Sequence, residues 1–176
     1  MRLRPVFLPL VFVLAAALVG CGGSESAPSS ESASSSNEAN AQSSGEVDRT
    51  ITLQPKGNQM KFRQTAFTVA PGQTVELVFE NTATSPSMQH NVVLLNSTED
   101  AVFERVGEAG MSAGSTKDYV PEDDAIVAYT EIAAPGETVS VTFTVPEAPG
   151  EYGYVCTFPG HWATMQGTMY VEDSAA

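Results

Sequence analysis

Three residues with metal-binding or nucleophilic side chains lie close together near the C-terminal end of the chain. The stretch CTFPGHWATM contains Cys156, His161 and Met165, with the spacing Cys-x4-His-x3-Met. The chain has two cysteines and two histidines in all, and the second histidine is His90. The grouping is open to three interpretations: residues that only pack, a thiol nucleophile with a base, or part of a metal site.

If folding brings His90 to the other three side chains, the set consists of two imidazoles, one thiolate and one thioether. Zinc sites use cysteine, histidine and carboxylate, and hard cations such as calcium prefer oxygen. Two histidines and one cysteine with a weak axial methionine is the ligand set of electron-transferring copper. A nucleophilic cysteine would need a histidine base with an orienting partner of its own. The set therefore favours copper, provided that the four side chains meet.

The elements that must position these side chains are predicted to be strands. Apolar and polar residues alternate with a period of two over much of the chain after Thr50. Pro-Gly pairs at 71–72, 135–136, 149–150 and 159–160 indicate the turns between them. Loops gather at the two ends of a β-sandwich, so the start of one strand can lie beside the end of another. We expect an all-β, Greek-key β-sandwich with strands at 50–54, 60–69, 75–80, 90–95, 125–132, 139–145, 151–157 and 166–172.

One segment departs from the strand pattern. Oxygen-bearing and acidic residues at 97–100 are followed by apolar residues at helical spacing, which predicts one short helix over 98–109. Either Gly107 or Gly110 is expected to end this helix. Met60 and Met88 are expected to lie in the apolar core.

The N-terminal region predicts export and attachment to a membrane. Residues 1–20 combine a basic start with an apolar run too short to span a bilayer comfortably, as in a signal peptide. The sequence LVGC at 18–21 resembles a bacterial lipobox, which implies that Cys21 carries a lipid. Residues 21–48 are poor in large apolar side chains and are expected to form a flexible tether. The folded domain is therefore expected over 49–176.

The charge of the chain limits the partners that it can have. Its formal net charge is −13, with 21 acidic against eight basic residues. Nucleic-acid binding requires a basic footprint, which such a composition does not supply. A strongly acidic chain can instead be steered toward a cationic partner.

Two segments resemble the copper motifs of the azurin and auracyanin branch of the cupredoxins. They are MQHNVVLL (88–95) and YVCTFPGHWATMQGTMYV (154–171). The resemblance implies one copper ion with His90, Cys156 and His161 as equatorial ligands and Met165 as the axial ligand. It further implies a weak axial contact from the backbone carbonyl of Gln89. The backbone N–H groups that donate to the thiolate are implied to be those of Asn91 and Phe158.

The resemblance also implies a function and a docking surface. The implied function is one-electron transfer between Cu(II) and Cu(I) in a monomer. Together with the lipobox-like LVGC, this predicts a carrier tethered to a membrane outside the cytoplasm. The edge of His161 is implied to lie in an apolar patch, built here by Phe158, Pro159 and Trp162. Expected partners are redox proteins such as a cytochrome or a respiratory or photosynthetic complex, with no small-molecule substrate.

Other functions of copper proteins require residues that this chain does not have at the matching positions. A copper enzyme would need further histidines for a second kind of copper, and a binuclear centre would need two cysteines in one loop. The chain has two histidines in all, so no enzyme is expected, and the position four residues after Cys156 is Gly160, which excludes the second cysteine of a binuclear centre. The alternative that stays open is an extracytoplasmic copper-binding or chaperone module without an electron-carrier role.

Overall fold

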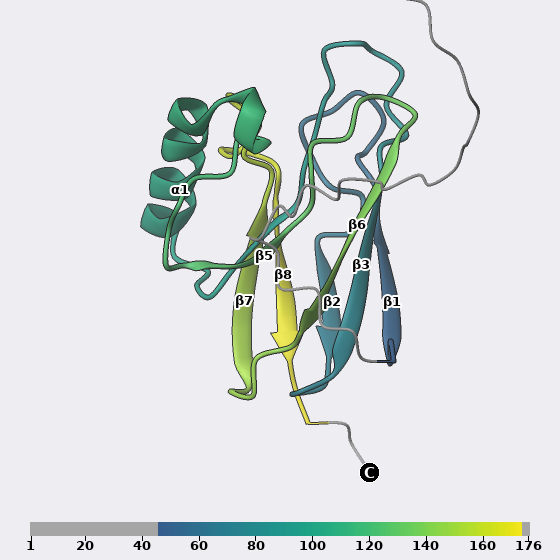
Figure 1. Cartoon of the computed structure of the whole chain (residues 1–176), viewed down its shortest axis with the longest axis vertical. Helices are drawn as coiled ribbons and strands as arrows, with labels where there is room; N and C mark the ends of the chain where they lie inside the picture. The colour runs from purple at the N-terminus through teal and green to yellow at the C-terminus, as the bar shows by residue number, and fades with distance from the viewer. Residues whose placement is uncertain (1–45, 174–176) are drawn as a thin grey trace, which may run out of the picture. The chain divides into compact units, whose positions relative to one another are not determined.

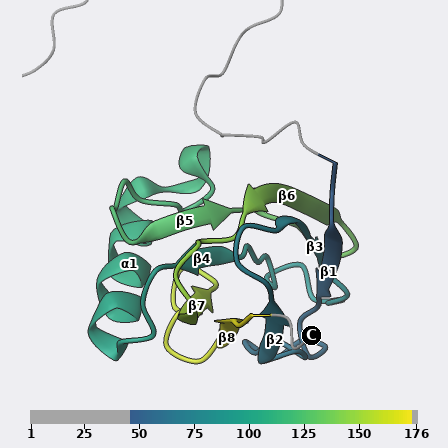
Figure 2. The same cartoon turned by 90° about the horizontal axis from the view of Figure 1, so that it is seen from below.

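The computed structural model describes residues 46–173 as two facing β-sheets with one helix outside them (Figure 1 and Figure 2). One sheet has the order β1 (Arg49–Leu53), β3 (Thr74–Glu80) and β6 (Thr138–Thr144). The other has the order β2 (Ala66–Val69), β8 (Gln166–Val171), β7 (Gly150–Val155), β4 (Val93–Leu95) and β5 (Ile126–Tyr129). The predicted signal peptide, Cys21 and most of the predicted tether lie outside the described residues. The predicted β-sandwich with one helix is confirmed.

The pairing of the strands joins distant parts of the chain. β1 pairs with β3 and β2 pairs with β8 in parallel, whereas the remaining pairs are antiparallel. Between β4 and β5 lie the helix α1 (Asp100–Ala113) and a 3-10 turn (Ser115–Lys117). In all four predicted Pro-Gly turns the glycine has a positive φ, a conformation that only glycine adopts at little cost.

The main core lies between the two sheets, where alternate side chains of each strand point inward. Leu77 and Phe79 of β3 meet Leu94 of β4 and Tyr154 of β7 in one buried cluster. Cys156 directly follows β7 and belongs to the same cluster. Tyr152, Tyr154 and Cys156 therefore share one inward face, and the thiol lies at the end of the core.

A second core lies on the outer face of the five-stranded sheet, beneath α1. Phe103 and Val106 of α1 pack with Val93 and Leu95 of β4 and with Val155 of β7. All three residues of β4 are therefore buried, which explains why this strand is apolar without interruption.

Two glycines let α1 approach the loop that carries the candidate ligands. A Cβ at Gly107 would come within 2.2 Å of the Trp162 ring, and one at Gly110 would lie 2.6 Å from the Tyr119 carbonyl oxygen. The prediction that one of these glycines ends the helix is wrong, because α1 continues to Ala113. The glycines serve close packing instead.

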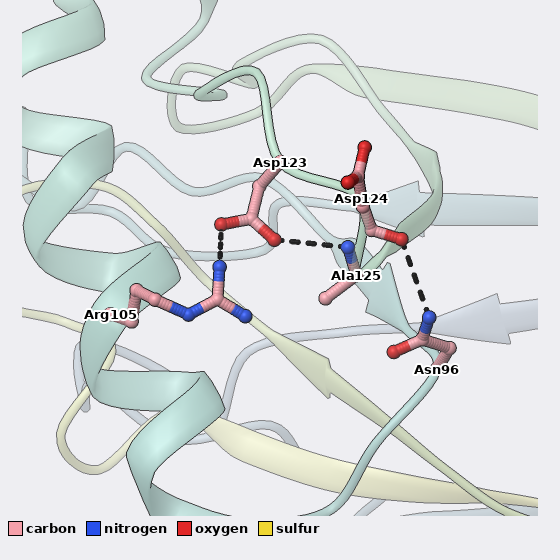
Figure 3. A network of polar contacts seen from close by, with 5 residues as sticks. All are labelled: Asn96, Arg105, Asp123, Asp124 and Ala125. Atoms are coloured by element: carbon pink, nitrogen blue, oxygen red, sulfur yellow. Dashed lines mark hydrogen bonds and ion pairs between the residues drawn. The ribbon is translucent and has the colours of Figure 1, made fainter.

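Polar contacts fasten α1 to the segment that precedes β5 (Figure 3). Arg105 of α1 forms an ion pair with Asp123, whose other carboxylate oxygen accepts a hydrogen bond from the Ala125 N–H at 2.9 Å. The Asn96 side chain donates to the Asp124 carbonyl at 3.3 Å. An exposed ion pair of this kind contributes at most about 1 kcal/mol, so the apolar contacts beneath the helix matter more.

Some predicted elements are shorter in the structure. The segment expected as a strand over 60–69 is a strand only at 66–69, and the one expected over 90–95 is a strand only at 93–95. Met60 is 42% exposed and Met88 is half-buried, so the prediction of both in the core is wrong. The contacts of residues 55–65 explain the first difference, because they form a loop closed by the Pro55–Phe62 bridge.

Within residues 46–173, none of the helices combines the length and the apolar character needed to cross a membrane.

Candidate metal centre

Three of the four predicted ligands present their donor atoms to one another at one end of the sandwich. The Cys156 Sγ atom lies 3.7 Å from the Nδ1 atom of His90 and 3.7 Å from that of His161. The two Nδ1 atoms are 3.1 Å apart. His90 is 66 positions from Cys156 and 71 positions from His161 in the sequence, yet the three residues form one buried cluster.

The triangle of donor atoms has the size of a metal site. The point equidistant from the three atoms lies about 2.0 Å from each, close to the metal–nitrogen and metal–sulfur bond lengths of about 2.0–2.3 Å. The residues therefore fit a bound metal ion, and the nitrogen and sulfur donors suit copper.

The burial of the cluster comes from the strands that carry it. His90 and Cys156 are 0% exposed, Met165 is 0% exposed and His161 is 4% exposed. His90 is held before β4 by a two-hydrogen-bond bridge to Ala133. A site this enclosed keeps water from the donor atoms, so the ligands rather than solvent define the geometry.

The loop from Cys156 to Met165 folds back on itself. The Met165 carbonyl accepts from the Cys156 N–H at 3.0 Å, and the Met165 N–H donates to the His161 carbonyl at 2.9 Å. The His161 N–H donates to the Phe158 carbonyl at 2.9 Å, and this hydrogen bond closes a turn at Pro159-Gly160. The backbone thus brings Met165 next to Cys156 and His161, as the spacing predicts.

Burial changes the protonation of the donor atoms. It lowers the pKa of His90 to about 4, assisted by the nearby charge of His161, and it lowers the pKa of His161. Both imidazoles are therefore neutral at neutral pH and available as ligands. Burial raises the pKa of the Cys156 thiol to about 12, so this thiol gives up a proton when it becomes a ligand.

Hydrogen bonds reach the Cys156 sulfur from the two predicted donors. The backbone N–H groups of Asn91 and Phe158 both donate to it, and they oppose the effect of burial on the thiol pKa. A buried thiol with a raised pKa is a poor nucleophile. The alternative of a Cys–His enzyme is weakened for this reason.

The Asn91 side chain joins the two strands that carry the ligands. Its Nδ2 atom donates to the Thr157 hydroxyl and to the Asp118 carbonyl, each at 2.8 Å, and its Oδ1 atom accepts from the Thr157 N–H at 2.8 Å. Thr157 is not among the residues predicted from the sequence. A threonine directly after the cysteine and an asparagine directly after the histidine are the only signals that could have indicated this pair.

A second buried asparagine supports the His90 side of the site and was also missed. The Asn81 side chain donates to the Met88 carbonyl at 2.8 Å and to the Ala133 carbonyl at 2.9 Å. It is 1% exposed and follows the alternating strand β3. A polar residue at the end of an apolar alternation was the available signal.

One residue of the predicted docking patch, Phe158, packs against His161. Phe158 and Pro159 are half-buried, and the Phe158 ring centroid lies 4.8 Å from that of His161. Trp162 is half-buried against Gly107 of α1, so part of its ring serves packing. Gln89 is half-buried and directly precedes His90, and the axial contact of its carbonyl remains a prediction.

Two facing sheets with a buried group of two histidines, one cysteine and one methionine at one end define a class, the mononuclear copper proteins of β-sandwich fold. Residues 49–172 match the copper-binding proteins of the plastocyanin/azurin family. The chain belongs to this family. Its copper site contains His90, Cys156 and His161, and the axial role of Met165 stays a prediction.

Individual relatives agree with this assignment. Auracyanin-A of Chloroflexus aurantiacus is 39% identical over 97% of this chain and 98% of its own length. An azurin of Achromobacter denitrificans is 43% identical over 57% of this chain and 67% of its own length. The solved structure of auracyanin A, described as a "blue" copper protein from Chloroflexus aurantiacus, has 42% identity and a TM-score of 0.65, covering 70% of this chain and 98% of that one.

Proposed function

We propose that this chain is a one-electron carrier whose single copper site alternates between Cu(II) and Cu(I). The observation that carries the proposal is the buried triangle of one sulfur and two nitrogen atoms, held by strands and a closed loop. Copper bound there would supply a centre that accepts and releases one electron. The description of auracyanin A as a "blue" copper protein supports the same chemistry.

The protein's contribution is to keep the ligands in place while the charge changes. His90 is fixed by its bridge to Ala133, and Cys156 is fixed by hydrogen bonds of its N–H and its sulfur. Met165 is proposed as the weak axial ligand, since the loop buries it beside His161. Donor atoms that move little when the charge of the copper changes lower the reorganisation energy of electron transfer.

The electron is proposed to enter and leave at the His161 side. His161 is the only one of the four ligands with measurable exposure, at 4%, and it lies beside the half-buried Phe158 and Pro159. We propose this apolar patch as the docking surface for a redox protein, such as a cytochrome or a respiratory or photosynthetic complex. The net charge of −13 supports steering toward a cationic partner.

Both histidines of the chain belong to this one site. No further imidazole is therefore available for a second copper of the kind that copper enzymes use, and this supports a carrier rather than an enzyme. A chaperone site would be expected to hold Cu(I) in an exposed position, whereas the four ligands here are at most 4% exposed.

A reductive titration tests the electron-carrier proposal. Copper-loaded protein should have an intense blue absorption that disappears with one electron per chain and returns fully on reoxidation. Visible absorption and a copper assay measure the two quantities. A protein that binds Cu(I) tightly but remains colourless with Cu(II) would favour the copper-binding or chaperone alternative.

We further propose that the carrier works outside the cytoplasm, anchored to a membrane by a lipid on Cys21. The signal-like residues 1–20 and the lipobox-like LVGC support this. In cells, Cys21→Ser should move the exported protein from the membrane fraction to the soluble fraction. Fractionation followed by immunodetection measures the shift, and an unchanged membrane fraction would contradict the anchor.

A further inference from the structure

Two consecutive residues beside the copper site, Asp118 and Tyr119, have left-handed backbone conformations. Their φ angles are 52° and 57°, and they are the two non-glycine residues with positive φ in the described part of the chain. This region is unfavourable for a bulky side chain such as tyrosine. Strained conformations persist only where the surroundings enforce them, and they collect at functional sites.

The strain is enforced by a tight turn and by α1. The Asp118 N–H donates to the Ser115 carbonyl at 3.2 Å, and the Tyr119 N–H donates to the Gly114 carbonyl at 2.9 Å. The Tyr119 carbonyl oxygen lies only 2.6 Å from where a Cβ of Gly110 would be. The helix and the turn together leave these two residues little freedom.

Asp118 contacts the His90 side of the site twice. Its backbone carbonyl accepts a hydrogen bond from the Asn91 side chain at 2.8 Å. Its carboxylate accepts from the Ile132 N–H at 3.0 Å. Ile132 directly precedes Ala133, which forms the bridge to His90.

Tyr119 contacts the loop on the other side of the sulfur. Its ring packs edge-on against Phe158, with the ring centroids 5.2 Å apart and an interplanar angle of 72°. Phe158 packs in turn against His161. The two strained residues therefore touch Asn91 and Phe158, the same two residues whose backbone N–H groups donate to Cys156.

We propose that Asp118 and Tyr119 are positioning residues that act as a clamp, holding the N–H groups of Asn91 and Phe158 against the Cys156 sulfur. Hydrogen bonds to a metal-bound thiolate reduce its electron donation and so favour the reduced metal. The clamp thereby keeps the reduction potential high. This inference rests on the proposed electron-carrier function.

The first test compares Tyr119→Ala with Tyr119→Phe, which keeps the ring. Tyr119→Ala should lower the reduction potential and shift the blue absorption band, while Tyr119→Phe should match the unsubstituted protein in both. If Tyr119→Ala does not fold, Tyr119→Leu, which retains apolar bulk without a ring edge, should show the same lowering. Equal potentials for the Ala or Leu variant and the Phe variant would overturn the clamp.

The second test separates the clamp from the charge of Asp118. Asp118→Asn removes the charge but keeps an acceptor for Ile132 and tolerates the left-handed backbone. Asp118→Gly removes both the charge and the acceptor. The potential of the Gly variant should therefore lie below that of the Asn variant, and a Gly value equal to or above the Asn value would count against the proposal.

Amide hydrogen exchange in the copper-free protein provides a readout that does not depend on electron transfer. Exchange at the Phe158 N–H should be faster in Tyr119→Ala than in Tyr119→Phe by about two- to tenfold, the factor for losing one aromatic pair. Equal exchange would overturn the clamp. A copper-loaded protein without blue colour would instead contradict the proposed function. Amide exchange in the copper-free protein would still test whether Tyr119 holds the Phe158 N–H in place.

Discussion

Replacing Cys156 by serine should remove essentially all of the intense blue absorption of the copper-loaded protein. The colour of such sites comes from charge transfer between thiolate sulfur and Cu(II), and a hydroxyl oxygen cannot replace it. The copper-free variant should still fold, because the substitution removes no large apolar group from the core. Visible absorption after copper loading and circular dichroism of the metal-free protein measure the two effects.

The chain contains its own control for this substitution. Cys21→Ser makes the same chemical change at the other cysteine, which is predicted to carry a lipid rather than copper. This variant should keep the full blue absorption. A blue Cys156→Ser protein, or a colourless Cys21→Ser protein with bound copper, would show that the ligand assignment is wrong.

Replacing Asn91 by alanine should reduce the free energy of unfolding of the copper-free protein by about 2–4 kcal/mol, because buried polar groups lose their partners. The Asn91 side chain is completely buried, and it satisfies the Thr157 N–H, the Thr157 hydroxyl and the Asp118 carbonyl. Its loss also loosens the connection between the strands that carry His90 and Cys156. Chemical denaturation measures the change.

Asn58→Ala is the matched control. The Asn58 side chain also makes several hydrogen bonds, accepting from the N–H groups of Thr84 and Ser85 at 2.8 and 3.0 Å and donating to the Thr84 hydroxyl at 3.0 Å. It is exposed, so water replaces these bonds. We expect a loss of about 0.5 kcal/mol or less. Equal losses for the two variants would contradict a special role for Asn91.

Local patterns in the sequence were sufficient to predict the ligand loop and the presence of the strands, although not the bounds of β2 and β4. The alternation in β3 and β6 shows which side chains face the core, and the spacing of Cys156, His161 and Met165 follows from one turn at Pro159-Gly160. That His90 joins them depends on chain pairing over 66 residues. The chemistry of the four side chains supplied that link, since no local pattern contains it.

The features that were missed depend on the packing of distant elements. Gly107 and Gly110 look like helix terminators, but they are needed where α1 meets Trp162 and Tyr119. Met60 looks like a core residue, yet its loop lies on the surface, where its carbonyl accepts from the Thr164 hydroxyl at 2.9 Å. No sequence signal marks a tyrosine that adopts a left-handed backbone.

The central claim is that one sulfur and two imidazole nitrogen atoms bind the same copper ion. X-ray absorption spectroscopy of the oxidised, copper-loaded protein tests it most directly. We expect one sulfur and two nitrogen scatterers at about 2.0–2.3 Å from copper. A copper shell of nitrogen and oxygen alone, without a short sulfur distance, would contradict the account.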